Sequence, residues 1–174
     1  MRKTGYRKTS ILRPRYASKV SQEIVFALDP GITTGWALWD QRKMIDSGTM
    51  TFNEKKREGI GMRYVSFKNW LTEMDRMAES IDVVFYKETS AHPNMNVAHS
   101  YGGFIATLTA WCEISGIDYQ PVPIGTTRRY ITGHNNASNE DLMKALQARR
   151  HEPADHHEAN AIALMIWALE TDGG

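Results

Sequence analysis

The sequence contains a single cysteine, Cys112, so it offers no intrachain disulfide and no zinc site built from several cysteines. It also lacks an uninterrupted apolar run of about 18 residues, the length that a membrane-spanning helix needs. The N-terminus has no apolar core of the kind found in secretory signals. These absences favour an intracellular, cytoplasmic protein in a reducing compartment, with no membrane partner.

Acidic residues are missing from the first 22 positions. Residues 1–22 hold seven basic side chains and no Asp or Glu, which leaves 14 basic against 20 acidic side chains, a formal charge of about −6, for residues 23–174. We expect a basic, flexible arm over 1–22 that contacts a polyanion, and one domain over 23–174. A solvated leader without a partner has a similar composition, as has an organelle transit peptide, although Gly5 and Pro14 interrupt any helix there. The basic residues of the arm are Arg2, Lys3, Arg7, Lys8, Arg13, Arg15 and Lys19.

Apolar periodicity predicts an α/β fold. Runs rich in β-formers indicate strands at 24–29, 34–40, 43–52, 81–87 and 117–124. Helical spacing indicates helices at 57–79, 97–115, 139–150 and 155–170, with Gly116 ending the second and Ser138 capping the third. This order implies a mixed five-stranded sheet with helices on both faces. Such sheets place their chemistry at the carboxyl ends of the strands.

The inward faces of the first and last helices follow from the same spacing. For 57–79 we expect the buried side to carry Ile60, Tyr64, Leu71, Met74 and Ala78. For 155–170 we expect Ala159, Ile162, Ala163, Ile166 and Leu169 to face the sheet.

Asp29 stands where the first apolar strand meets the turn Asp29-Pro30-Gly31. A carboxylate at the lip of a buried strand is costly to desolvate unless a cation or hydrogen-bond donors compensate it. The charge therefore suggests a metal ligand, although Asp-Pro-Gly is also an ordinary turn sequence.

Three further acids accompany Asp29 at the ends of elements. Glu88 closes the fourth strand, and Asp155 and Glu158 lie three apart at the start of the last helix, on one face. Two-metal phosphodiester hydrolysis needs several carboxylates converging from different elements, because Mg²⁺ prefers oxygen ligands. Each acid also has a simpler interpretation when it is taken alone. Glu88 is then a solvated charge at the end of a strand, and Asp155 and Glu158 complement the helix dipole. No His-Glu-x-x-His pattern joins His151, His156 and His157 into a zinc site, so we expect them to be adjuncts or surface residues.

Two of these motifs resemble those of RuvC-type Holliday junction resolvases, which have an RNase H-like fold. The first is Leu28-Asp29-Pro30-Gly31-x-Thr33-Thr34-Gly35-Trp36-Ala37, and the closing one is Asp155-His156-His157-Glu158-Ala159-Asn160-Ala161-Ile162-Ala163-Leu164. The resemblance extends through Pro121-Val122-Pro123, the turn Thr126-Thr127-Arg128-Arg129 and Thr132-Gly133. The compact chain and its basic leader are most similar to bacteriophage versions.

The resemblance implies a homodimeric endonuclease that nicks four-way junctions, and it extends the expected substrates to Y-shaped DNA and replication intermediates. It implies two Mg²⁺ ions, replaceable by Mn²⁺, held by Asp29, Glu88, Asp155 and Glu158. It also implies that Arg128, Arg129 and the N-terminal arm contact DNA phosphates.

The sequence departs from the family pattern at two places. Glu158 stands where the family has Asp, a longer carboxylate of the same charge. In Tyr86-Lys87-Glu88-Thr89, one alignment puts Lys87 rather than Glu88 at the family's glutamate. Because neighbouring strand residues face opposite sides, this choice decides whether an ammonium or a carboxylate faces Asp29. We favour Glu88 as the ligand.

Two other functions fit parts of the sequence. A junction-binding protein of the same fold that has lost a metal ligand is the consequence if Lys87 takes the ligand position. A nucleotide-binding protein of the actin and hexokinase type also has an Asp-x-Gly hairpin, but it needs a second similar domain, for which this chain is too short.

Overall fold

The computed structural model describes residues 20–40, 43–53, 59–171 and 173. All seven basic side chains of the N-terminal arm lie outside these residues. A short 3₁₀ helix, η1 (Val20–Gln22), leads into the first strand.

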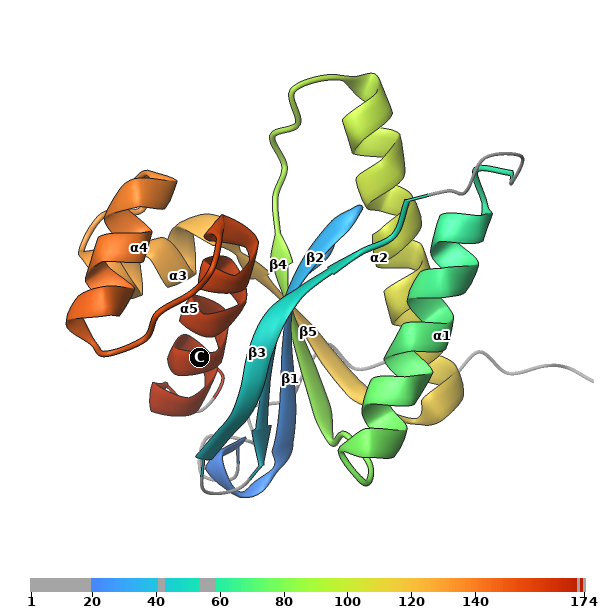
Figure 1. Cartoon of the computed structure of the whole chain (residues 1–174), viewed down its shortest axis with the longest axis horizontal. Helices are drawn as coiled ribbons and strands as arrows, with labels where there is room; N and C mark the ends of the chain where they lie inside the picture. The colour runs from blue at the N-terminus through green and yellow to red at the C-terminus, as the bar shows by residue number, and fades with distance from the viewer. Residues whose placement is uncertain (1–19, 41–42, 54–58, 172, 174) are drawn as a thin grey trace, which may run out of the picture.

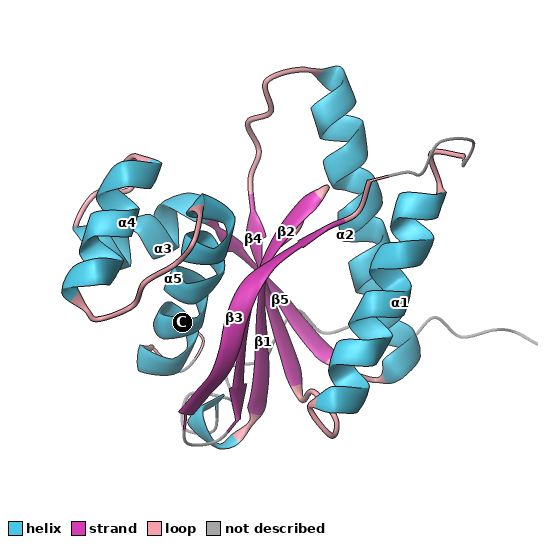
Figure 2. Ribbon diagram, viewed as in Figure 1, coloured by secondary structure: helices cyan, strands magenta, loops and turns pink. Residues whose placement is uncertain are grey.

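A five-stranded mixed sheet forms the centre of the fold (Figures 1 and 2). Strands β1 (Ile24–Asp29), β2 (Thr33–Asp40) and β3 (Lys43–Thr51) form an antiparallel meander, as the tight turns between them predict. Strands β4 (Val83–Glu88) and β5 (Asp118–Pro123) extend the sheet in parallel from β1. The resulting order is β3-β2-β1-β4-β5. The predicted mixed sheet is confirmed, and the carboxyl ends of β1, β4 and β5 lie at the same edge.

Helices cover both faces of the sheet, as expected (Figure 1). Helices α1 (Met62–Met77) and α2 (Met95–Ser115) pack against each other on one face. Helix α5 (His156–Glu170) lies on the other face, with α3 (Ile124–Thr132) and α4 (Asn139–Ala148) packed outside it. The capping predictions hold, since Ser138 accepts a hydrogen bond from the Asp141 amide and Gly116 ends α2 with φ 71°. None of the described helices is both long and apolar enough to cross a membrane.

Alternation along the strands divides the apolar residues between two cores. In β1, Val25 and Ala27 join the cluster around α5, whereas Phe26 and Leu28 join the cluster with α1 and α2. Strand β4 alternates in the same way, with Val83 and Phe85 toward α5 and Val84 and Tyr86 toward α1 and α2. Successive side chains of a strand point to opposite faces, so the same alternation places the last residues of β1 and β4. Asp29 and Lys87 belong to the α5 face, and Glu88 belongs to the face of α1 and α2.

Three details of the helices differ from the expectation. The segment around Arg128 and Arg129 is a helix, α3, rather than a turn. Ile60 precedes α1 and is 68% exposed, and the α1 core positions are Phe67, Leu71 and Met74. Helix α5 is buried from Glu158 to Met165 on all sides because α3 and α4 cover the side away from the sheet. A helix enclosed in this way no longer has a single apolar stripe.

The single thiol gives a direct test of the core between α1, α2 and the sheet. Cys112 is fully buried, and its burial raises the pKa of the thiol to about 12. We expect the folded protein to react with a thiol reagent at pH 8 at least 100-fold more slowly than the urea-unfolded chain, because the thiolate is the reactive form. Absorbance of released thionitrobenzoate measures both rates. Equal rates would contradict the burial of Cys112.

Candidate functional site

The candidate site begins at the turn after β1. Asp29 is the last residue of β1, and its side chain is buried on the α5 face of the sheet, with the residue only 3% exposed. The following turn is closed by Thr34, whose hydroxyl donates to the carbonyl oxygen of Gly31 (2.8 Å) and accepts from its amide (3.2 Å). The fully buried Thr34 therefore fixes the direction in which the chain leaves Asp29.

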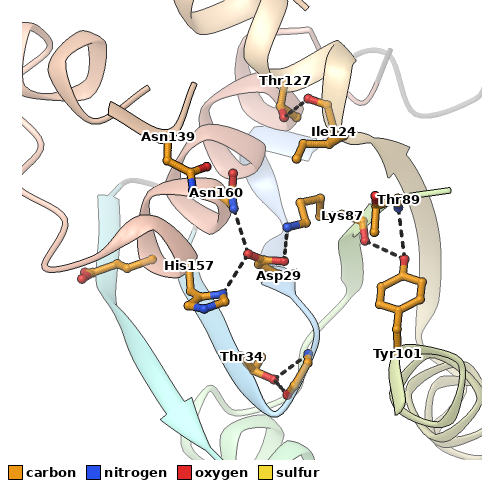
Figure 3. Close-up of polar contacts among 12 residues, drawn as sticks. Asp29, Thr34, Lys87, Thr89, Tyr101, Ile124, Thr127, Asn139, His157 and Asn160 are labelled. Atoms are coloured by element: carbon orange, nitrogen blue, oxygen red, sulfur yellow. Dashed lines mark hydrogen bonds and ion pairs between the residues drawn. The ribbon is translucent and has the colours of Figure 1, made fainter. Parts of the chain in front are cut away.

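Three side chains of this protein contact the carboxylate of Asp29 (Figure 3). The ammonium of Lys87, from the end of β4, lies 2.5 Å from Oδ1. The amide Nδ2 of Asn160, from α5, donates to Oδ2 at 2.9 Å. The ring Nδ1 of His157, one turn earlier on α5, lies 3.3 Å from the same Oδ2. Both oxygens of Asp29 are thus engaged by groups that also come from this chain.

These contacts decide the charge of the buried carboxyl group. Burial acts to raise the pKa of Asp29, but the hydrogen bond with His157, the charge and contact of Lys87, and the bond from Asn160 outweigh it. The pKa of Asp29 is therefore lowered, and the group is a carboxylate at neutral pH. Its negative charge is balanced inside the site by the ammonium of Lys87.

The structure reverses our preference for Glu88 over Lys87 as the residue that faces Asp29. Glu88 is exposed and lies on the face of α1 and α2, as Tyr86 does. Burial, and after it the charge of Glu88, raises the pKa of Tyr86 to about 12. Lys87 has the opposite orientation and reaches Asp29. The reason is the register of β4, in which Leu28 pairs with Tyr86 and so brings Lys87 level with Asp29.

Tyr101 holds the backbone at the end of β4. Its hydroxyl donates to the carbonyl oxygen of Lys87 (3.2 Å) and accepts from the amide of Thr89 (3.3 Å) (Figure 3). These two backbone groups flank the position where the strand ends. A side chain from α2 therefore positions Lys87 through its backbone.

The acids at the start of α5 have other partners. Asp155 is the N-cap, and its carboxylate accepts from the amides of His157 (2.8 Å) and Glu158 (3.0 Å). Glu158 is buried and accepts from the hydroxyl of Ser47 (2.6 Å) and the amide of Ala154 (2.8 Å). The expected inward direction of Glu158 is seen, but the residues that α5 brings to Asp29 are His157 and Asn160.

The first turn of α5 packs directly on the backbone of β2 at Gly35. A Cβ at this position would lie 1.9 Å from the carbonyl oxygen of His157. Only a glycine lets the first turn of α5 pack against β2 at this distance. This close contact sets the depth at which His157 and Asn160 reach Asp29.

A cleft of about 1150 Å³ opens above Asp29. Its walls come from the β1–β2 turn, the start of α1, the segment after β4, the start of α2, and helices α3 and α5. Among the described residues, three basic side chains line it, Arg63, Lys87 and Arg128, together with one acid, Asp29. Four histidines also line it, namely His92, His99, His156 and His157. The cleft is therefore cationic although the domain around it carries an excess of acids.

Of the two arginines expected to contact DNA phosphates, only Arg128 lines the cleft. Its guanidinium donates to the carbonyl oxygen of Ala137 and to Oδ1 of Asn139 (2.5 Å), which ties α3 to the start of α4. Burial lowers the pKa of Arg128, and the charge of Asp29 partly opposes this effect. Arg129 is exposed and is not part of the cleft wall.

The donor set around Asp29 does not fit a pair of divalent metal ions. Among the described residues, no group of three His, Cys, Asp or Glu side chains converges in a way that could hold a metal ion. Glu88 faces away, Asp155 and Glu158 are engaged by amides and a hydroxyl, and Lys87 brings a positive charge to the carboxylate. Hard divalent cations need several anionic oxygens within about 2.0–2.6 Å, so this arrangement supplies too few.

Sequence reasoning missed part of the site. Asn160 carries a detectable signal, because an amide in an Ala- and Ile-rich run is a buried polar group that needs a partner. Arg63 and Tyr101 carry no such signal, since their positions depend on how α1 and α2 pack over the edge of the sheet.

The sequence matches no family model and no curated protein. The fold is similar to that of RuvC from Thermus thermophilus, solved in complex with a Holliday junction substrate, with a TM-score of 0.70, 15% identity and coverage of 85% of this chain and 96% of that chain. A second structure of Thermus thermophilus RuvC gives a TM-score of 0.67 at 15% identity, and the match covers 85% of this chain and 97% of that chain. The yeast mitochondrial Holliday junction resolvase gives a TM-score of 0.63 at 9% identity, and the match covers 87% of this chain and 79% of that chain. The predicted RNase H-like architecture is confirmed.

The close approach at Gly35 yields a stability test. We expect Gly35→Ala to lower the free energy of unfolding by about 3 kcal/mol, because the added methyl must displace the backbone of α5. Gly102→Ala is the matched control, since its Cβ meets nothing within 4 Å and α2 gains helix propensity. Urea unfolding followed by circular dichroism measures both. If the two variants were equally stable, α5 would not be seated on β2 as described.

Proposed function

We propose that this chain binds branched DNA, four-way junctions foremost, through the cleft around Asp29. The observation that carries the proposal is the charge of the described cleft lining, where Arg63, Lys87 and Arg128 accompany one acid, Asp29, on a fold similar to that of RuvC. Cations on a DNA-facing wall release counterions from the phosphates, which drives binding without reading sequence. That a RuvC structure contains a Holliday junction substrate supports the choice of DNA form.

The distribution of charge supports a polyanion as the ligand. Residues 23–174 carry a formal charge of about −6, so an anionic ligand is repelled by most of the domain and attracted only where cations gather. The cleft is such a place, and its lining includes Asp29 and Lys87 at the ends of β1 and β4. The basic arm over residues 1–22 adds a second source of phosphate contacts in this proposal.

Two versions of this function follow from the motifs. The first is a Mg²⁺- or Mn²⁺-dependent crossover junction endonuclease, supported by Asp29 and by the Asp155-x-x-Glu158 pattern on this fold. The second is a protein that binds junctions without cutting them, favoured by the contact of Lys87 with Asp29. The described arrangement fits the second version better, because the metal ligands do not converge.

Several finer points remain predictions. A homodimer would match the two-fold symmetry of a four-way junction, and light scattering of the purified protein tests it. Binding to Y-shaped DNA and replication intermediates, a cytoplasmic site of action and a likeness to bacteriophage versions rest on the sequence resemblance. The nucleotide-binding alternative is not favoured, since the described residues form one sheet with a single Asp-x-Gly hairpin.

Two arginines on α1 provide a matched test of the cleft. Arg63 lines it, whereas Arg76 lies in the last turn and is paired with Glu73 on the exposed surface. We expect Arg63→Gln to weaken binding to a four-way junction several-fold and to reduce the salt slope of log K by about one, because one phosphate contact is lost. Arg76→Gln should change neither quantity. Fluorescence anisotropy over a series of salt concentrations gives both values, and equal behaviour of the two variants would exclude the cleft as the DNA site.

Removal of residues 1–22 tests the arm separately. We expect weaker junction binding and a flatter salt dependence, since up to seven basic side chains are lost. The same anisotropy titrations measure this effect on the truncated chain, with circular dichroism confirming that the domain is folded. Unchanged affinity and slope would show that the arm makes no DNA contact.

A further inference from the structure

We propose that Lys87 is the resident cation of the cleft, so that the cleft binds the phosphodiester backbone without a metal ion. The ammonium of Lys87 takes the place beside Asp29 that a divalent ion would need. This inference rests on the proposed function, since it concerns how the same cleft neutralises DNA phosphates. It goes beyond that function by naming the group that offsets Asp29 in place of a metal ion.

The first step is the occupation of the Asp29 carboxylate. An ionised carboxylate offers about four acceptor positions. Here Lys87 lies on Oδ1 at 2.5 Å, and Asn160 and His157 lie on Oδ2 at 2.9 and 3.3 Å. A cation that approached Asp29 would find most of these positions taken and would be repelled by the ammonium at the same time.

The second step is the position of Lys87, which is built into the sheet. Register places Tyr86 opposite Leu28, so the next residue of each strand, Lys87 and Asp29, meet on the α5 face. Tyr101 bonds to the backbone on either side of this position, at the Lys87 carbonyl oxygen and the Thr89 amide. The Lys87 side chain is only 15% exposed. The ion pair is therefore a fixed part of the site and not a contact between two mobile surface chains.

The third step is the balance of charge in the cleft. Among the described lining residues, Lys87 offsets the charge of Asp29, and the other charged side chains, Arg63 and Arg128, are both basic. The cleft therefore keeps a positive field for phosphate with no ion from solution. In a cleft where carboxylates lined the same wall, DNA would bind only after divalent ions had offset them.

The binding experiment compares wild type with Lys87→Gln on a four-way junction. At matched ionic strength, wild type should bind equally well, within about twofold, in EDTA and in Ca²⁺, since its cation is already present. Lys87→Gln should bind several-fold more weakly in EDTA, with a salt slope smaller by about one. Wild-type binding that requires Ca²⁺, or unchanged binding by Lys87→Gln in EDTA, would overturn the proposal.

The metal experiment uses electron paramagnetic resonance to count bound Mn²⁺ and needs no activity. The double variant Lys87→Glu/Asn160→Asp should bind at least one Mn²⁺ more than wild type, because two carboxylates then join Asp29 where the ammonium and the amide now stand. The control Lys68→Glu/Asn136→Asp makes the same charge change at exposed residues, and it should bind no more Mn²⁺ than wild type. Equal Mn²⁺ binding by a folded double variant and this control would overturn the role assigned to Lys87.

The two proposals fail in different ways. If wild type binds a four-way junction no better than a linear duplex in either EDTA or Ca²⁺, the proposed function is wrong, whereas the Mn²⁺ comparison still reports on Lys87. If junction preference is strong but depends on a divalent ion, the proposed function stands and the resident cation is wrong. Circular dichroism of each variant establishes folding, and Lys87→Gln, which adds no charge, provides the test if the double variant does not fold.

Discussion

The contact between the first turn of α5 and β2 is the constraint on which the site depends. Gly35 has no side chain, so the backbone of α5 lies directly on the strand, with the His157 carbonyl oxygen where a Cβ would be. Because α5 is enclosed by the sheet on one side and by α3 and α4 on the other, it cannot move outward without opening a core. The contact at Gly35 places His157 and Asn160 beside Asp29. Their hydrogen bonds help to keep the buried carboxylate charged.

Most of the fold could be predicted from the sequence, because strand alternation, turn residues and caps are local signals. The meander after Ile24, the two parallel strands and the capping of α4 by Ser138 all follow from such signals. Helix α3 was missed because nine residues around Arg128 and Arg129 give too short a periodic pattern. The exposure of Ile60 was missed because helix starts are poorly marked without a capping side chain, and Gly61 provides none.

The site was predictable as a location but not as a set of contacts. Asp29 could be identified because a charge at the end of an apolar strand is unusual. The choice between Lys87 and Glu88 could not be made, since a shift of one residue exchanges the two faces and only the pairing with β1 fixes it. The partners of Glu158 were equally inaccessible, because Ser47 lies 111 residues away in the chain and reaches it through β3.

The identity of the two donors that α5 and β4 bring to Asp29 has a consequence for how this cleft can change over generations. Lysine codons become glutamate codons, and asparagine codons become aspartate codons, by a single A-to-G transition at the first base. One point mutation in the gene at Lys87 therefore replaces the ammonium with a carboxylate, and another at Asn160 replaces the amide. Neither step changes the glycines at the turn and under α5, or the residues that set the pairing of β1 with β4. An inherited loss or gain of acids in this cleft thus requires only single-base changes at these two positions.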